Sequence, residues 1–163
     1  MDYSSQIQAN ARKIEDLIAG EPDLFLVEIK IKPTNNVKVF IDGDQGVSIE
    51  RLIKYNRSLY KQIEESGMFP NGDYSLEVSS PGLDEPLKNF RQYQKNIGRP
   101  VEVITIDGLK REGKLLSTNE QEIVVEEIKG KGKKAETIQH TILINQIKTT
   151  KKEEHFLHAN RVL

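Results

Sequence analysis

The chain has 163 residues, of which 36 % are hydrophobic and 30 % charged, a composition typical of one medium-sized globular domain or two small ones. No apolar run approaches the roughly 20 residues that a membrane-spanning helix needs, and the first twenty residues carry charges throughout, so no secretory signal is predicted. Because cysteine is absent, disulfides, thiolate nucleophiles and cysteine-bound zinc are excluded, and we expect a cytoplasmic protein without membrane contact.

The net charge of −1 is divided unevenly along the chain. Residues 1–90 contain 10 Lys and Arg against 15 Asp and Glu, a balance of −5, whereas residues 91–163 contain 14 against 10, a balance of +4. Such a division is typical of a protein whose basic half contacts phosphate while its acidic half meets a basic protein. Ordinary solvation of two surfaces explains it equally well.

The first elements predicted are a helix and a hairpin. Apolar residues at three- and four-residue spacing predict an amphipathic helix from Ser4 or Ser5 to Ala19, with a serine as its N-cap. Residues 24–32 and 37–42 are rich in apolar and β-branched side chains, and a short polar turn separates them. These two segments therefore predict two strands joined as a hairpin.

An acidic turn follows and leads into a second helix. Asp42, Asp44 and Glu50 suggest a site for a hard cation, since calcium and magnesium take carboxylate oxygens. Their spacing does not match an EF-hand loop, so we interpret the turn as solvated and predict no metal site. Ser48 is the predicted N-cap of the helix, and Gly67 is predicted to mark its end.

The most specific motif of the chain comes with the next strand. Leu76 and Val78 alternate with polar residues, which is typical of a half-buried strand, until Pro81 removes a hydrogen-bond donor and ends it. We expect Gly82 to adopt a backbone conformation that is closed to other residues. The residues of this structural motif are Ser79, Ser80, Pro81, Gly82, Leu83, Asp84 and Pro86.

This strand and its Ser-Ser-Pro-Gly-Leu-Asp turn, with Pro86 and Leu87 after it, resemble the signature of the ribosome maturation factor RimP family. The resemblance extends over most of the chain. It implies an α/β domain followed by an Sm-like, SH3-type barrel, and a non-enzymatic factor that binds the free small (30S) ribosomal subunit and aids its maturation. Glu85 departs from the family, which often has Arg there, so a contact made by that Arg would be absent or inverted.

The second half of the chain is predicted to be rich in short strands. Residues 88–98 are expected to form a short helix. Strand-like runs follow at residues 101–106, 109–116, 123–128, 137–142 and 144–149. Asp107-Gly108 predicts a tight hairpin between the first two runs. Five short antiparallel strands favour a small closed or nearly closed barrel, because closure leaves few sheet edges exposed.

We therefore predict an α+β fold with two domains. An N-terminal α-β-β-α-β domain is expected at residues 1–88, and a small five-stranded Sm-like/SH3-type β-barrel at residues 98–150. Residues 89–97 form the predicted junction, and residues 151–163 a C-terminal tail.

Two basic groups in the second half are candidates for contact with RNA. They are Lys129, Lys131, Lys133 and Lys134 between two predicted strands, and Lys110, Arg111 and Lys114 on the first hairpin. Lysines among glycines adapt to an irregular phosphate backbone and give affinity without sequence preference. In the alternative reading the loop only solubilises the protein and balances Glu126, Glu127 and Glu136. Aromatic residues are too few there to predict reading of bases.

No catalytic constellation is found in the sequence. Ser79 and Ser80 have no basic partner nearby and are interpreted as satisfying backbone groups at the strand end. His155 and His158 have no third ligand at a suitable spacing. The sequence lacks the glycine-rich phosphate loops and the nucleophile elbow. We therefore expect no enzymatic activity, no cofactor and no small-molecule substrate.

The expected partners are two components of the small ribosomal subunit. The basic half would contact ribosomal RNA, and the acidic half would meet a basic ribosomal protein by electrostatic complementarity. The alternative from another class is an Sm-like or SH3-like adaptor that binds a peptide and has no ribosomal role.

Overall fold

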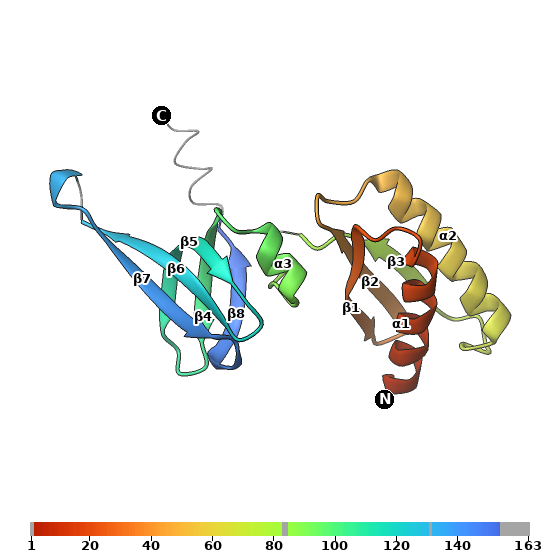
Figure 1. The fold of residues 1–163 in the computed structure, drawn as a ribbon. Helices are drawn as coiled ribbons and strands as arrows, with labels where there is room; N and C mark the ends of the chain where they lie inside the picture. The colour runs from red at the N-terminus through yellow and green to blue at the C-terminus, as the bar shows by residue number, and fades with distance from the viewer. Residues whose placement is uncertain (1, 83–84, 131, 154–163) are drawn as a thin grey trace. The chain divides into compact units, whose positions relative to one another are not determined.

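The computed structural model describes residues 2–82, 85–130 and 132–153, and the chain divides into two units, Met1–Pro81 and Gly82–Leu163 (Figure 1). The fold is α+β, as predicted. Several residues that the sequence singled out lie outside the described residues, namely Leu83, Asp84, Lys131, His155 and His158. No helix in the described ranges is long and apolar enough to cross a membrane.

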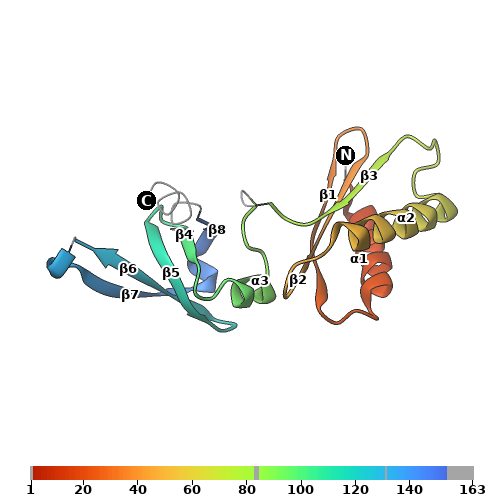
Figure 2. The ribbon, with the colours of Figure 1, turned by 90° about the horizontal axis from the view of Figure 1, so that it is seen from above.

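The first unit is a three-stranded sheet with two helices. Its elements are α1 (Ser4–Ile18), β1 (Leu24–Lys32), β2 (Asn36–Gly43), α2 (Ile49–Ser66) and β3 (Ser75–Ser79). The strand order is β1-β2-β3, with β1 antiparallel and β3 parallel to β2. Both helices lie on one face of this sheet, as the two perpendicular views in Figures 1 and 2 show. The element order is the predicted α-β-β-α-β.

The core of the first unit lies between the sheet and the helices. Val37, Val39 and Ile41 alternate along β2 and are at most 1 % exposed, because side chains two apart on a strand share a face. They pack with the buried face of α2, which includes Tyr55 and Leu59. On the opposite face of β2, Lys38 and Phe40 are half-buried.

Helix α2 has both predicted ends. Ser48 is its N-cap, and the Ser48 hydroxyl accepts a hydrogen bond from the Arg51 amide at 3.2 Å. Gly67 ends the helix with a φ of 67°, the left-handed conformation for which glycine is favoured. The sequence therefore identified both termini of this helix correctly.

Helix α1 begins at Ser4, within the predicted range, but without the predicted serine cap. Its N-cap position is Tyr3, which makes no side-chain capping bond, and Ser4 is already the first helical residue. The Asp2 carboxylate accepts the Ser4 amide at 2.9 Å, so an acidic residue before the helix satisfies one of the free amides of its first turn. The expected serine cap is thus wrong.

Gly82 does not adopt the expected left-handed conformation. Its φ is not among the positive values, and a Cβ added there would meet no atom within 4 Å. The position therefore tolerates an ordinary backbone, and the prediction of a glycine-only conformation is wrong. Gly43 is a position in the first unit where a side chain would clash, because a Cβ added there would lie 2.1 Å from the Gly46 carbonyl oxygen.

In its described residues, the second unit is an antiparallel five-stranded sheet with one short α-helix. Its elements are α3 (Phe90–Lys95), β4 (Pro100–Thr105), β5 (Lys110–Thr118), β6 (Glu122–Lys129), η1 (Gly132–Lys134), β7 (Glu136–Leu143), η2 (Ile144–Gln146) and β8 (Ile147–Lys152). The strand order is β7-β6-β5-β4-β8. The five predicted strands are confirmed. In the described residues β7 and β8 are the sheet edges, so the pairing shows no closed barrel and does not confirm an Sm-like one.

The second unit has its own hydrophobic core. Val101, Val103 and Leu115 are fully buried in it, together with residues of β6 and β7. Tyr93 of α3 packs against this core, and its hydroxyl donates to the Thr150 hydroxyl at 2.8 Å. Burial raises the pKa of Tyr93. Helix α3 is thereby attached to β8 by both packing and a buried hydrogen bond.

Candidate nucleic-acid interface

The β6–β7 hairpin extends beyond the rest of the second sheet. Strand β5 pairs with β6 only as far as Lys114 opposite Glu126, whereas β6 and β7 remain paired as far as Lys129 opposite Glu136. Residues 127–130 and 132–138 therefore form an arm, in which only β6 and β7 pair with each other. Figure 1 shows this arm leaving the sheet and ending in the η1 turn.

Basic residues are concentrated at the end of the arm. Lys129 is the last residue of β6, and Lys133 and Lys134 lie in η1, where all three are exposed. Gly130 and Gly132 have φ values of 89° and 61°, so left-handed glycines shape this turn. The structure thus places three of the predicted lysines at one projecting tip.

The Glu127 carboxylate, at the base of the arm, contacts the side chains of His140 and Lys129. Its Oε1 atom lies 2.9 Å from His140 Nε2 and 4.0 Å from Lys129 Nζ. The hydrogen bond from His140 lowers the pKa of Glu127, and the charges of Lys129 and Arg111 lower it further against the effect of desolvation. The structure therefore gathers Arg111, Lys129 and His140 around one carboxylate.

The basic group on the first hairpin is divided between two faces. Lys110 and Lys114 alternate along β5 on one side, and Arg111 lies on the other, toward Glu127. Lys110 Nζ lies 3.4 Å from Glu102 and 3.0 Å from a Glu112 carboxylate oxygen, and these hydrogen bonds raise the pKa of Lys110. Lys110 is therefore paired within the unit.

One group of carboxylates in the described ranges is close enough to hold a cation. The oxygens of Glu102, Glu112 and Glu153 lie within 4.8 Å of one another. The Lys110 ammonium already sits beside the first two and supplies a compensating positive charge. The arrangement is explained as an ion-pair cluster on the sheet surface.

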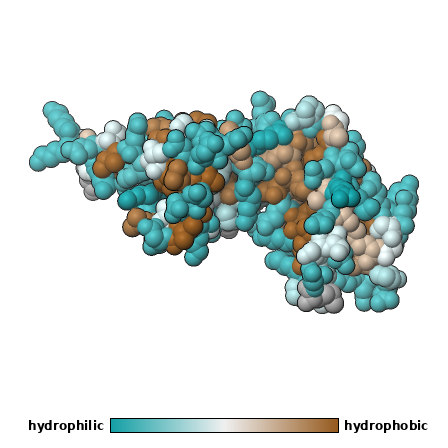
Figure 3. All heavy atoms as spheres, turned by 60° about the horizontal axis from the view of Figure 1, so that its bottom comes forward, coloured by the Kyte–Doolittle hydropathy of each residue, from teal (hydrophilic) through white to brown (hydrophobic). Residues whose placement is uncertain are grey.

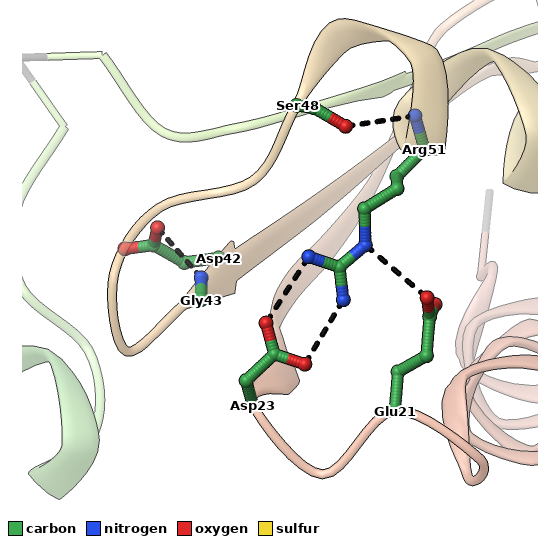
Figure 4. Close-up of polar contacts among 6 residues, drawn as sticks. All are labelled: Glu21, Asp23, Asp42, Gly43, Ser48 and Arg51. Atoms are coloured by element: carbon green, nitrogen blue, oxygen red, sulfur yellow. Dashed lines mark hydrogen bonds and ion pairs between the residues drawn. The ribbon is translucent and has the colours of Figure 1, made fainter.

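The acidic turn before α2 is organised by ion pairs and backbone contacts (Figure 4). Arg51 donates two hydrogen bonds to Asp23, at 3.1 and 2.9 Å, and its Nε lies 3.3 Å from Glu21. The Asp42 carboxylate accepts the Gly43 amide at 2.9 Å. The bidentate pair of Arg51 with Asp23 links the start of α2 to the turn before β1. Sequence reasoning missed it, because the partners are 28 residues apart.

The structural motif joins the two units. Ser79 is the last residue of β3 and lies opposite Phe40 of β2, while Ser80 is exposed and Pro81 is half-buried. The Glu85 amide donates to the Gly82 carbonyl at 3.2 Å. After Pro86, the Leu87 amide donates to the Thr150 carbonyl at 2.7 Å, so the end of the motif is held by β8.

These features define a class of protein, namely a two-unit α+β protein with a projecting basic arm whose charge suits an anionic partner. A family model described as "RimP N-terminal domain" matches residues 13–84. The ribosome maturation factor RimP of Cytophaga hutchinsonii is 36 % identical over 114 residues, which cover 68 % of this chain and 68 % of the relative.

Two further relatives have similar identity and coverage. The RimP of Christiangramia forsetii is 38 % identical over 109 residues, covering 67 % of this chain and 68 % of the relative. The RimP of Flavobacterium psychrophilum is 37 % identical over 110 residues, covering 68 % of each. The chain belongs to the ribosome maturation factor RimP family. The family resemblance inferred from the motif at Ser79–Leu87 is confirmed, and a role in ribosome maturation is supported.

Proposed function

We propose that this protein binds the free small (30S) ribosomal subunit in the cytoplasm and assists its maturation without catalysis. Membership of the RimP family supports the ribosomal role. The observation that carries the RNA contact is the arm, whose tip exposes Lys129, Lys133 and Lys134 away from the hydrophobic core.

The arm suits a phosphate backbone for geometric and electrostatic reasons. A two-stranded projection reaches into a groove that a flat sheet cannot enter, and its terminal ammonium groups displace counterions from phosphates. Contacts of this kind depend on shape and charge, not on base identity. Lys114 is exposed on β5 and is the next candidate, whereas Lys110 is neutralised by two carboxylates.

The first unit has the opposite charge. Residues 1–81 contain nine Lys and Arg against 13 Asp and Glu, which gives −4, so this unit repels phosphate and favours a basic ribosomal protein. We propose that the two units together bind one conformation of the assembling subunit more tightly than its alternatives. Such differential affinity shifts the population toward the state that accepts further ribosomal proteins.

We also propose that the second sheet curls into the Sm-like, SH3-type barrel that the family resemblance implies. Its order brings the last strand, β8, beside the first, β4, and irregularities in pairing after Ile104 and Leu115 favour strong local curvature. The proposed barrel spans residues 98–150, within the second unit.

Co-sedimentation with purified small subunits at low and moderate salt tests the function. We expect binding at low salt that falls steeply as salt rises, because each phosphate contact releases counterions. Absence of binding at low salt would exclude the ribosomal role and favour the adaptor alternative. Salt-insensitive binding would remove RNA from the interface.

Replacing Lys129, Lys131, Lys133 and Lys134 together by Gln tests the arm. The slope of log affinity against log salt should become shallower by up to about 0.9 per lost contact on duplex, and about 0.7 on single strands. The double variant Lys110→Gln with Lys114→Gln removes two positive charges from β5, outside the arm, and serves as the comparison. Lys32→Gln in β1 controls for the loss of a positive charge in the first unit. An unchanged slope in the arm variant would contradict this placement.

A further inference from the structure

Some large apolar side chains are exposed, although each unit buries others in its own hydrophobic core. Within the described ranges they are Ile49, Ile53 and Tyr60 in the first unit and Ile97, Ile106, Leu109, Ile128 and Leu143 in the second. Figure 3 shows apolar patches on both units among mostly hydrophilic side chains on the face that it draws. Exposed apolar residues that share one face of an element often mark a contact surface.

The three in the first unit form a stripe along α2. Ile49 is 74 % exposed, Ile53 47 % and Tyr60 48 %, and their spacing of four and seven residues places them on one side of the helix. This side differs from the buried face, which contains Tyr55 and Leu59. Ile53 and Tyr60, with Asn56 and Arg57, line a surface hollow of about 380 Å³.

The stripe faces the β3 side of α2. The Tyr60 ring stacks on Tyr74 with centroids 5.4 Å apart, and Tyr74 stacks on Phe69 at 5.1 Å. The Tyr74 hydroxyl donates to Glu64 at 2.8 Å. Because Tyr74 immediately precedes β3, the Tyr60 end of the stripe lies beside the start of this strand. Arg51 lies on the other side of the helix, where it pairs with Asp23 (Figure 4).

Strand β3 offers an open edge beside this stripe. In the part of the chain that the structure describes, β3 pairs only with β2. The Ser75 amide donates to the Asn35 carbonyl at 3.1 Å, so the strand's alternation directs the backbone groups of Leu76 and Val78 away from β2. An unpaired edge next to exposed apolar side chains is the arrangement that accepts an added strand.

We propose that the unpaired edge of β3, together with the apolar stripe of α2, binds an extended, basic segment of a ribosomal protein by strand addition. The segment would pair with Leu76 and Val78 and place alternate apolar side chains on Ile53 and Tyr60. The inference rests on the proposed function and names the protein partner of the acidic unit.

Charge determines the kind of partner. Glu50 and Glu64 of α2 and Glu77 of β3 are exposed, and the unit as a whole carries −4 from nine basic and 13 acidic residues. Arg57 lies in the lining of the hollow, and Lys54 and Lys61 of α2 are also exposed, so the attraction for a basic partner comes from the charge of the whole unit. An RNA strand would be repelled, whereas lysines and arginines flanking an apolar segment would be attracted.

Hydrogen exchange of the Leu76 and Val78 amides in the full chain tests this binding mode. With purified small subunits added, exchange at these two amides should slow. With protein-free small-subunit RNA at the same salt, exchange should stay unchanged. Slowing with RNA alone would overturn the proposal in favour of an RNA surface. Slowing that grows with the protein's own concentration would overturn it in favour of self-association.

A variant separates this inference from the function on which it rests. Ile49→Gln with Ile53→Gln changes only exposed side chains, so the fold should persist, and affinity for small subunits should fall about tenfold with an unchanged salt slope. Lys61→Gln, on the same helix and exposed, is the matched control. If the double variant binds subunits normally while its Leu76 and Val78 amides exchange as fast as in the free protein, strand addition at β3 would be excluded and the ribosomal role would stand. No binding by the unmodified chain would overturn both.

Discussion

At the scale of single residues, Gly43 shows how one missing side chain shapes the end of β2. A Cβ there would lie 2.1 Å from the Gly46 carbonyl oxygen and 3.1 Å from the Leu24 side chain. The carbonyl belongs to the backbone and moves only if the whole turn shifts. Gly43→Ala should therefore lower the free energy of unfolding by about 1–3 kcal/mol, measured by urea denaturation.

Gly82→Ala provides the matched control. Gly82 has no positive φ and has open space around its Cα, so the change should stay within about 0.5 kcal/mol of the parent. Equal losses in the two variants would show that the close approach at Gly43 relaxes freely.

The sequence predicts a residue's role well where the cause is local. Ser48 and Gly67 were identified because a cap needs only its own helix. The role of Gly43 was missed, because it depends on how the chain returns at Gly46. Gly82 was assigned a special conformation from the Pro-Gly pair alone, but its φ is not positive.

At the scale of elements, the arm couples its charge to pH through Glu127. The hydrogen bond from His140 lowers the pKa of Glu127, so its ionised form is favoured in the folded arm. A depressed carboxyl pKa stabilises the fold fully above the unfolded value, about 4.3, and this stabilisation is lost as pH falls through the lower folded pKa.

Glu127→Gln should therefore remove part of the acid sensitivity of the second unit. We expect the variant to be less stable than the parent near pH 7 and the two thermal midpoints to converge as pH falls below about 4.3. Glu120→Gln, in the turn after β5, controls for the loss of one charge. A constant difference between variant and parent across this pH range would refute the coupling.

The strands themselves were predictable, whereas their arrangement was not. Alternation and the Asp107-Gly108 turn predicted the hairpin, and Gly108 has a φ of 90°. The last strand begins at Ile147, three residues later than predicted, because Ile144–Gln146 form a 3₁₀ turn. The arm exists because β6 pairs with β7 over more residues than it pairs with β5. Alternation within one strand does not show where its partner strand ends.

At the scale of the whole molecule, the charge division read from the sequence coincides with two separately cored units. The first core is built on β2 and α2 and the second on β4, β5 and β6. Alternation along the predicted strand places Lys110 and Arg111 on opposite faces, but the sequence could not show which carboxylates they meet, because strand register decides this. A sum of charges therefore indicates a basic half but not its binding surface.

Separate cores predict separate responses to a cavity. Ile41 in the first unit and Leu115 in the second are both fully buried, so Ile41→Ala and Leu115→Ala should each cost about 2–5 kcal/mol in its own unit. Hydrogen exchange of the full chain should show faster exchange in the first sheet for Ile41→Ala and in the second sheet for Leu115→Ala. Equal acceleration in both sheets by either variant would mean that the units unfold as one. With independent units, loss of subunit binding in a destabilised variant can be traced to the acidic unit or to the basic one.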